Sequence, residues 1–205
     1  MAKFTRLLIG ACVAVVALAM FAGPALALRS LQTSNPGAQE GTGSNVSFEE
    51  EGGFLRTVCT GLTLRGSGNE RVAKTAGAAV GTITEGRTTG CRAFGFVSAT
   101  ITVEAEAARP FRMGYNSILG TLPTITGILT LTEGVRFTIV SGGRTCRYEG
   151  RSGFLFPVSR GTYEGGSFLA EPKARLLAGS TRECPAEGSL RGRLNFERQR
   201  TVTLV

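Results

Sequence analysis

The feature that most constrains the fold is a segment of fourteen residues that occurs twice, each time beginning with a cysteine. The copies span 91–104 and 184–197, with glycine four positions after the cysteine and glutamate thirteen positions after it in both. Between these marks apolar and polar residues alternate with a period of two, which is typical of a β-strand with one buried face. The sequence therefore predicts two related halves, about 46–120 and 128–205. The aligned apolar residues are Val97 with Leu190, Ile101 with Leu194 and Val103 with Phe196.

Alternation of this kind recurs along the chain, in short runs separated by turn-forming residues. Many of the 29 glycines lie between such runs, and no segment keeps the i, i+3, i+4, i+7 spacing of an amphipathic helix beyond a turn or two. These patterns predict an all-β fold, an antiparallel β-sandwich or a barrel-like closed sheet. A half of about 65–80 residues is marginal as an independent core, so we expect 46–205 to form a single domain.

The same patterns give finer expectations for individual segments. Residues 128–132 and 135–140 are predicted to form a hairpin around Glu133-Gly134, and 162–166 a loop. Residues 197–200 are predicted to form a turn, because continued alternation would bury Arg198 and Arg200. Most of the twelve phenylalanines are expected to face inward, for example Phe96, Phe137, Phe154, Phe156 and Phe196.

The N-terminus has the pattern of a secretory signal. Lys3 and Arg6 precede an apolar run over 7–22, and the small residues of Gly-Pro-Ala-Leu-Ala end at Ala27. We expect residues 1–27 to be a helical signal peptide that is cleaved; the alternative is an uncleaved membrane anchor. Residues 28–45 are polar and lack apolar periodicity, which predicts a flexible linker. No later apolar run reaches the roughly 20 residues of a membrane-spanning helix, so none is predicted after cleavage.

Cysteine usage agrees with export to an oxidising compartment. The signal contains Cys12, which leaves an even four cysteines and no Cys-x-x-Cys pair. Four cysteines allow three pairings, and the repeat favours one bridge in each half. Each bridge would stabilise the fold by about 3–4 kcal/mol in the loop-entropy account. The predicted disulfides are Cys59–Cys91 and Cys146–Cys184.

Missing residue types limit the chemistry. The chain has no histidine and no aspartate, which excludes Ser-His-Asp and Cys-His catalysis and histidine-ligated metals in this chain alone. No phosphate-binding glycine loop is present. We therefore predict no catalytic, cofactor-binding or metal-binding residues, and no enzyme activity. The enzymatic alternative is a glutamate-dependent hydrolase, for which Glu104 and Glu106 are the candidate pair. For the repeated Glu104 and Glu197, structural pairing with Arg92 or Arg191 is the simpler interpretation.

Charge gives a weak indication of a partner. Without Lys3 and Arg6 the chain keeps 21 basic and 15 acidic residues, a net charge of +6, and nearly all basic residues are arginine. Such a surface favours an anionic polymer of the cell envelope or another envelope protein, although it could simply be solvated. Nucleic acid is not expected as a partner of an exported chain. A second alternative is a carrier of a small apolar ligand inside the sheet.

Three short motifs, together with the export signal, carry a family resemblance. They are Gly-Thr-Ile-Thr before Gly-Cys91, Ser-Ala-Thr-Ile-Thr-Val103, and Thr-Cys146-Arg-Tyr-Glu-Gly150. In these the chain resembles small secreted β-rich proteins of actinobacteria, which have no assigned activity. The resemblance implies an exported, disulfide-bonded β-fold and supplies no functional residues. The overall expectation is a secreted, extracellular or wall-associated, non-catalytic binding or structural module.

Overall fold

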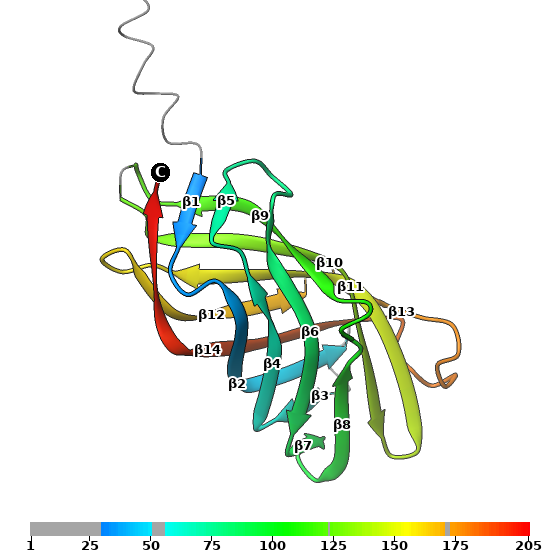
Figure 1. The fold of residues 1–205 in the computed structure, drawn as a ribbon. Helices are drawn as coiled ribbons and strands as arrows, with labels where there is room; N and C mark the ends of the chain where they lie inside the picture. The colour runs from blue at the N-terminus through cyan, green and yellow to red at the C-terminus, as the bar shows by residue number, and fades with distance from the viewer. Residues whose placement is uncertain (1–29, 51–55, 123, 171–172) are drawn as a thin grey trace, which may run out of the picture.

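A computed structural model describes residues 30–50, 56–122, 124–170 and 173–205, and the expected signal peptide lies outside them. The described residues form strands joined by turns and loops, with no helix among them (Figure 1). The all-β, antiparallel class predicted from the sequence is confirmed. The strands are β1 (Ser30–Thr33), β2 (Gly37–Glu50), β3 (Arg56–Cys59), β4 (Gly61–Gly68), β5 (Arg71–Ala73), β6 (Ala79–Thr89), β7 (Cys91–Ala93), β8 (Val97–Val103), β9 (Phe111–Leu119), β10 (Gly127–Ser141), β11 (Arg144–Pro157), β12 (Thr162–Ala170), β13 (Ala174–Leu176) and β14 (Glu187–Leu204).

The sheet closes on itself. At the end that carries β1 and β5, called the upper end from here on, the hydrogen-bonded order is β2-β4-β6-β9-β10-β11-β12-β14 and back to β2. At the lower end, which carries β7, the order is β2-β3-β7-β8-β10-β11-β13-β14 and back to β2. The long strands β2, β10, β11 and β14 belong to both rings, and shorter strands fill the remaining positions end to end. Of the two predicted forms, the pairings therefore give the closed, barrel-like one.

A bulge in β10 keeps the buried face continuous along this long strand. Thr132 pairs with Ser152 and Val135 with Gly150, so β10 contains one more residue than β11 between these pairs. Gly134 takes a positive φ of 63° at this point, which glycine adopts without steric cost. Ile128, Thr130 and Thr132 face inward before the bulge, whereas Val135, Phe137 and Ile139 do so after it. The predicted hairpin around Glu133-Gly134 is wrong, because β10 continues through the bulge.

Residues 30–45, predicted to be a flexible linker, instead form β1 and most of β2. Glycine is frequent in β2 because atoms of the neighbouring strand β14 leave little room for side chains. A Cβ atom at Gly43 would lie 2.8 Å from the carbonyl oxygen of Arg193, and one at Gly41 would lie 3.0 Å from the side chain of Leu194. A run of glycine and polar residues therefore serves here as a wall strand packed closely against β14.

Two other sequence-based expectations fail at the upper end. Residues 162–166 lie in β12 and are not a loop, and 197–200 lie within the continuous strand β14. Arg198 is exposed, but Arg200 is buried as continued alternation requires. The guanidinium of Arg200 donates to the carbonyl oxygen of Asn35 (2.8 Å) and lies over the ring of Phe196, with 5.1 Å to the ring centroid. Burial of this group lowers its pKa.

The lower half of the core is built on three aromatic rings from both predicted halves of the chain. The rings of Phe48 in β2, Phe137 in β10 and Tyr148 in β11 contact one another, with centroids 5.8 Å apart for Phe48–Phe137, 4.8 Å for Phe48–Tyr148 and 5.4 Å for Phe137–Tyr148. All three side chains are almost fully buried. Phe154 and Phe156 are also buried and Phe196 is partly buried, as expected. Phe96 contradicts the expectation, since 76% of it is exposed.

The two copies of the repeated segment differ in local structure. Cys91 lies in β7 and Gly95 in the turn before β8, whereas Cys184 precedes β14 and Gly188 lies within it. Their central apolar residues, Ile101 and Leu194, are buried in both copies. The alternation therefore predicted the strand faces correctly, and an internal duplication stays a prediction.

Candidate anion-binding groove

An open groove of about 1270 Å³ lies on the outside of the barrel, where the wall is interrupted between β8 and β9. These strands occupy the same position between β6 and β10, β8 towards the lower end and β9 towards the upper end. The connection 104–110 leaves the wall between them, and the β10 bulge lies beside it. The charged residues that line the groove are Glu104, Glu106, Arg109, Arg112, Glu133, Arg136, Arg147 and Arg151.

Glu104 is the most constrained carboxylate of this groove. Arg147 donates two hydrogen bonds to this carboxylate, from Nε to Oε1 at 3.3 Å and from Nη2 to Oε2 at 3.2 Å. The hydroxyl of Thr138 also donates to Oε1. These hydrogen bonds, chiefly those from Arg147, lower the pKa of Glu104. The carboxylate is therefore held ionised. Its partner differs from both arginines named from the sequence, since Arg191 pairs with Glu49.

Two further arginines of the groove are neutralised by neighbours on adjacent strands. Arg136 pairs with Glu149 of β11, and Arg151 pairs with Glu133 at the β10 bulge. These cross-strand pairs are exposed, so each contributes little to stability. They fix the positions of the side chains along one wall of the groove.

Arg109 and Arg112 are different, because neither forms an ion pair with another described residue. Arg109 ends the connection between β8 and β9, and Arg112 points outward from the start of β9. Both are exposed. Two uncompensated guanidinium groups on one side of a groove are chemically suited to an anion, because arginine can bind carboxylate and phosphate oxygens through paired N–H donors.

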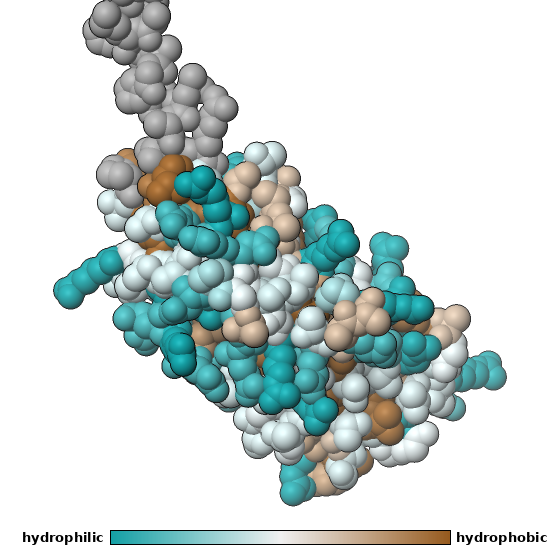
Figure 2. Space-filling view, in the orientation of Figure 1, coloured by the Kyte–Doolittle hydropathy of each residue, from teal (hydrophilic) through white to brown (hydrophobic). Residues whose placement is uncertain are grey.

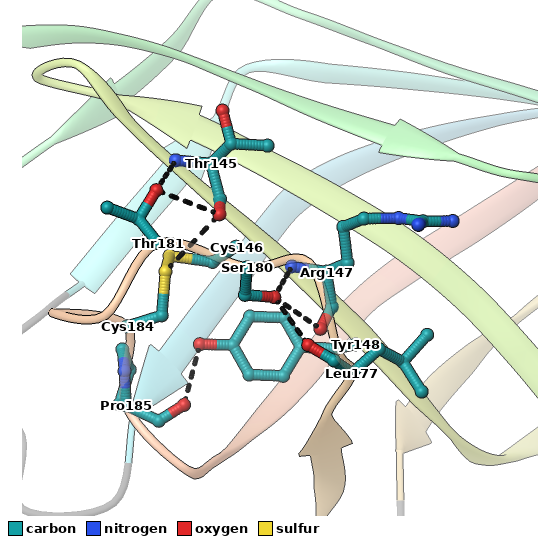
Figure 3. Close-up of a disulfide and its surroundings, with 9 residues drawn as sticks. All are labelled: Thr145, Cys146, Arg147, Tyr148, Leu177, Ser180, Thr181, Cys184 and Pro185. Atoms are coloured by element: carbon teal, nitrogen blue, oxygen red, sulfur yellow. Dashed lines mark hydrogen bonds between the residues drawn. A yellow bond between two sulfur atoms is a disulfide. The ribbon is translucent and has the colours of Figure 1, made fainter.

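The loop that contains Cys184 positions the Arg147 backbone (Figure 3). The Arg147 amide donates to Ser180 Oγ at 2.9 Å, and the Thr145 amide donates to Thr181 Oγ1 at the same distance. The buried hydroxyl of Tyr148 donates to the carbonyl oxygen of Pro185 at 3.1 Å. The disulfide from Cys146 fastens this loop to β11, so the groove wall is supported from behind by a covalent bridge.

Both predicted disulfides are confirmed, Cys59–Cys91 and Cys146–Cys184. All four sulfur atoms are thereby committed to covalent bonds, and both bridges lie in the lower ring of the barrel. Among the described residues no group of three or more acidic or cysteine side chains is placed to hold a metal ion. In the same part of the chain no helix is long and apolar enough to cross a membrane.

The arrangement of glutamates does not favour the hydrolase alternative. A glycosidase acid needs a carboxyl group whose pKa is raised, so that it carries a proton near neutral pH. Glu104 has a lowered pKa and its oxygens are occupied by Arg147 and Thr138. Glu106, the other candidate, is exposed on the connection 104–110. Glu197 is also exposed, on β14, away from this groove.

The barrel interior does not favour the carrier alternative. Two small pockets lined in large part by apolar core residues have volumes of about 40 and 50 Å³. Pockets for drug-sized ligands are roughly 300–1,000 Å³. Pockets of the observed size hold one or a few waters, so the inward side chains form a packed core at these places.

The comparisons with known proteins assign no relative. No protein-family model, no curated protein and no solved structure matches the chain.

Replacing Glu104 with glutamine is expected to lower the free energy of unfolding by less than about 1 kcal/mol, because solvent screens a partly exposed pair. The lowered pKa sets the pH dependence. The contribution is fully present above the ordinary value of 4.5 and is lost as the pH falls through the lower folded value. Urea unfolding of both proteins at pH 7 and at pH 3 measures it. A difference that persists unchanged at pH 3 would contradict the assignment.

Proposed function

We propose that the protein is exported and acts without catalysis as a binding module of the cell envelope, holding an anionic envelope polymer in the groove between β8, β9, β10 and β11. The observation that carries the proposal is the pair Arg109 and Arg112, exposed in the groove without acidic partners among the described residues. Of the other groove arginines, Arg147, Arg151 and Arg136 pair with Glu104, Glu133 and Glu149, whereas the groove carboxylate Glu106 forms no ion pair with another described residue. The two free guanidinium groups therefore exceed the unpaired acidic charge and provide the net attraction.

Two further features support an extracellular role. The signal pattern at the N-terminus directs a chain to export. Both disulfides bridge buried cysteines, and such bonds form and persist chiefly in oxidising compartments. A disulfide-stabilised β-protein with a pre-formed groove needs no conformational change to bind, which limits the entropic cost of association.

The test is retention of the purified protein on isolated cell wall at low salt. Replacing both Arg109 and Arg112 with glutamine is expected to weaken retention roughly tenfold, from two contacts of under about 1 kcal/mol each. The matched control replaces Arg71 and Arg198, two exposed arginines of β5 and β14, with glutamine. It removes the same charge outside the groove and should retain nearly the full affinity.

Salt provides the second readout. Wild-type retention should fall steeply as salt rises, because screening acts on exposed charges. Equal weakening by the groove and control variants would show that overall charge alone is responsible and would overturn the groove assignment. Retention that disappears after protease treatment of the wall would identify an envelope protein as the partner instead of the polymer.

A further inference from the structure

The lower end of the barrel carries two aromatic side chains of which half or more is exposed. Phe94 and Phe96 flank Gly95 in the turn between β7 and β8, and they are 51% and 76% exposed. We call this turn, 94–96, the aromatic tip. Val58 and Val140 are also exposed at this end, and Figure 2 shows an apolar patch between β8 and the β10–β11 turn. Burying these side chains against a partner would release a large apolar area from water.

The backbone of the aromatic tip adopts a conformation that is unfavourable for phenylalanine. The Phe96 amide donates to the Ala93 carbonyl at 3.2 Å, and both central residues of this turn, Phe94 and Gly95, have positive φ values of 52° and 80°. Such turns favour asparagine, aspartate or glycine at the first central position, where a bulky residue is strained. Strain retained at an exposed position points to a function that requires the side chain.

The aromatic tip is also held rigidly from behind. Cys91 lies three residues before Phe94 and is bonded to Cys59 of β3. The Phe94 amide donates to the Arg56 carbonyl at 3.1 Å, which ties the start of the turn to β3. Val97, directly after the tip, pairs with Ala93 and begins β8. A braced turn presents its aromatic rings without a large loss of conformational entropy on binding.

Positive charge surrounds the aromatic tip. Arg92 lies two residues before Phe94, and Arg144 lines the same small hollow as Phe94. Both arginines are exposed, and neither forms an ion pair with another described residue. Glu183 lines this hollow too, and Arg182 precedes it in the sequence, so these two charges balance in number and leave the excess to Arg92 and Arg144. The lower end therefore combines exposed aromatic rings with two uncompensated arginines.

We propose that the aromatic tip docks on an anionic lipid bilayer, with Phe94 and Phe96 inserted at the headgroup level and Arg92 and Arg144 contacting lipid phosphates. Phenylalanine side chains bury apolar area at the boundary between headgroups and acyl chains, and arginines near an anionic surface add attraction. A second copy of the chain fits less well, because two tips meeting face to face would bring four uncompensated arginines together. The site is separate from the groove and does not depend on the polymer proposed there.

The test measures co-sedimentation of the mature chain with vesicles. Vesicles of mixed phosphatidylglycerol and phosphatidylcholine are compared with vesicles of phosphatidylcholine alone, at equal lipid concentration. The wild type should bind the anionic vesicles at least tenfold more tightly. The variant F94N/F96S should lose this binding at least tenfold, while R92Q/R144Q should lose the preference for anionic lipid.

The choice of asparagine separates function from folding. Asparagine suits positive φ, so F94N relieves the strained turn, and the double variant should be at least as resistant to urea as the wild type. The control L119S/L122S removes two exposed apolar residues elsewhere and should bind as the wild type does. R109Q/R112Q should also keep vesicle binding, which distinguishes this proposal from the groove.

Three results would overturn the proposal. The first is absence of binding to anionic vesicles by the wild type. The second is equal binding by the wild type and F94N/F96S. The third is a wild-type dimer, seen by sedimentation velocity, that F94N/F96S converts to a monomer, since this would assign the aromatic tip to self-association.

Discussion

Replacing all four paired cysteines with alanine is expected to lower the free energy of unfolding by about 6–8 kcal/mol and to leave much of the chain unfolded at 37 °C. The bridges close segments with sequence separations of 32 and 38 residues, and each restricts the unfolded chain by about 3–4 kcal/mol in the loop-entropy account. The sum is comparable to the whole stability of a typical domain, which is about 5–15 kcal/mol. Urea unfolding followed by circular dichroism measures the loss.

Variants that lack one bridge show how much of the free energy of unfolding each disulfide contributes. C59A/C91A opens the link between β3 and β7 behind the aromatic tip, and C146A/C184A releases the loop that supports Arg147. The second variant keeps the Tyr148–Pro185 and Thr145–Thr181 hydrogen bonds, so its groove should still form in part. Wild-type protein treated with a reductant in urea is the control for packing changes caused by alanine. A combined loss under about 2 kcal/mol would contradict the prediction.

Replacing Phe48 with alanine is expected to lower the free energy of unfolding by about 3–5 kcal/mol, the range for deleting a buried aromatic side chain. Phe48 is completely buried and contacts the rings of Phe137 and Tyr148. Gly188 leaves room for its ring, because a Cβ atom there would lie 2.1 Å from Phe48 Cζ. The Phe48 ring thus occupies the space that the missing side chain of Gly188 leaves free in β14.

The chain provides a matched control of the same residue type. Phe96→Ala removes an identical side chain from the exposed aromatic tip, where it makes few contacts, and should change the free energy of unfolding by less than about 0.5 kcal/mol. Urea unfolding of both variants under one set of conditions measures the contrast. Similar losses at the two positions would show that the aromatic ring of Phe48 does not organise the core.

The sequence predicted the features that follow from the alternation of apolar and polar residues and from the number of cysteines. A period of two is enough to place Ile101 and Leu194 on the buried face, because neighbouring residues of a strand point to opposite sides. The repeat reduced three cysteine pairings to one, which is the pairing observed. The predicted linker over 28–45 failed because a strand made of glycine and polar residues carries no alternation, although its close packing against β14 requires small residues.

Other features depend on contacts between distant segments. The turn predicted at 197–200 assumed that Arg200 could not be buried, but the Asn35 carbonyl and the Phe196 ring accept its guanidinium. Glu104 was singled out from the sequence, whereas its partner Arg147 lies 43 positions away and carries no local signal. Arg109 and Arg112 were missed for the same reason, since only the folded wall shows which arginines lack acidic neighbours.

The ring closure described above has a consequence for the order of folding. β2 and β14 complete the ring, and the pairing of Glu49 with Ser189 joins positions 140 residues apart. Contacts this remote in sequence form slowly, because the intervening chain must first lose its freedom. Until β14 pairs with β2, the sheet has two unpaired edges and its core is incomplete. For the export proposed above, this late closure would keep the chain loose enough to be threaded through a narrow translocation channel before it becomes compact.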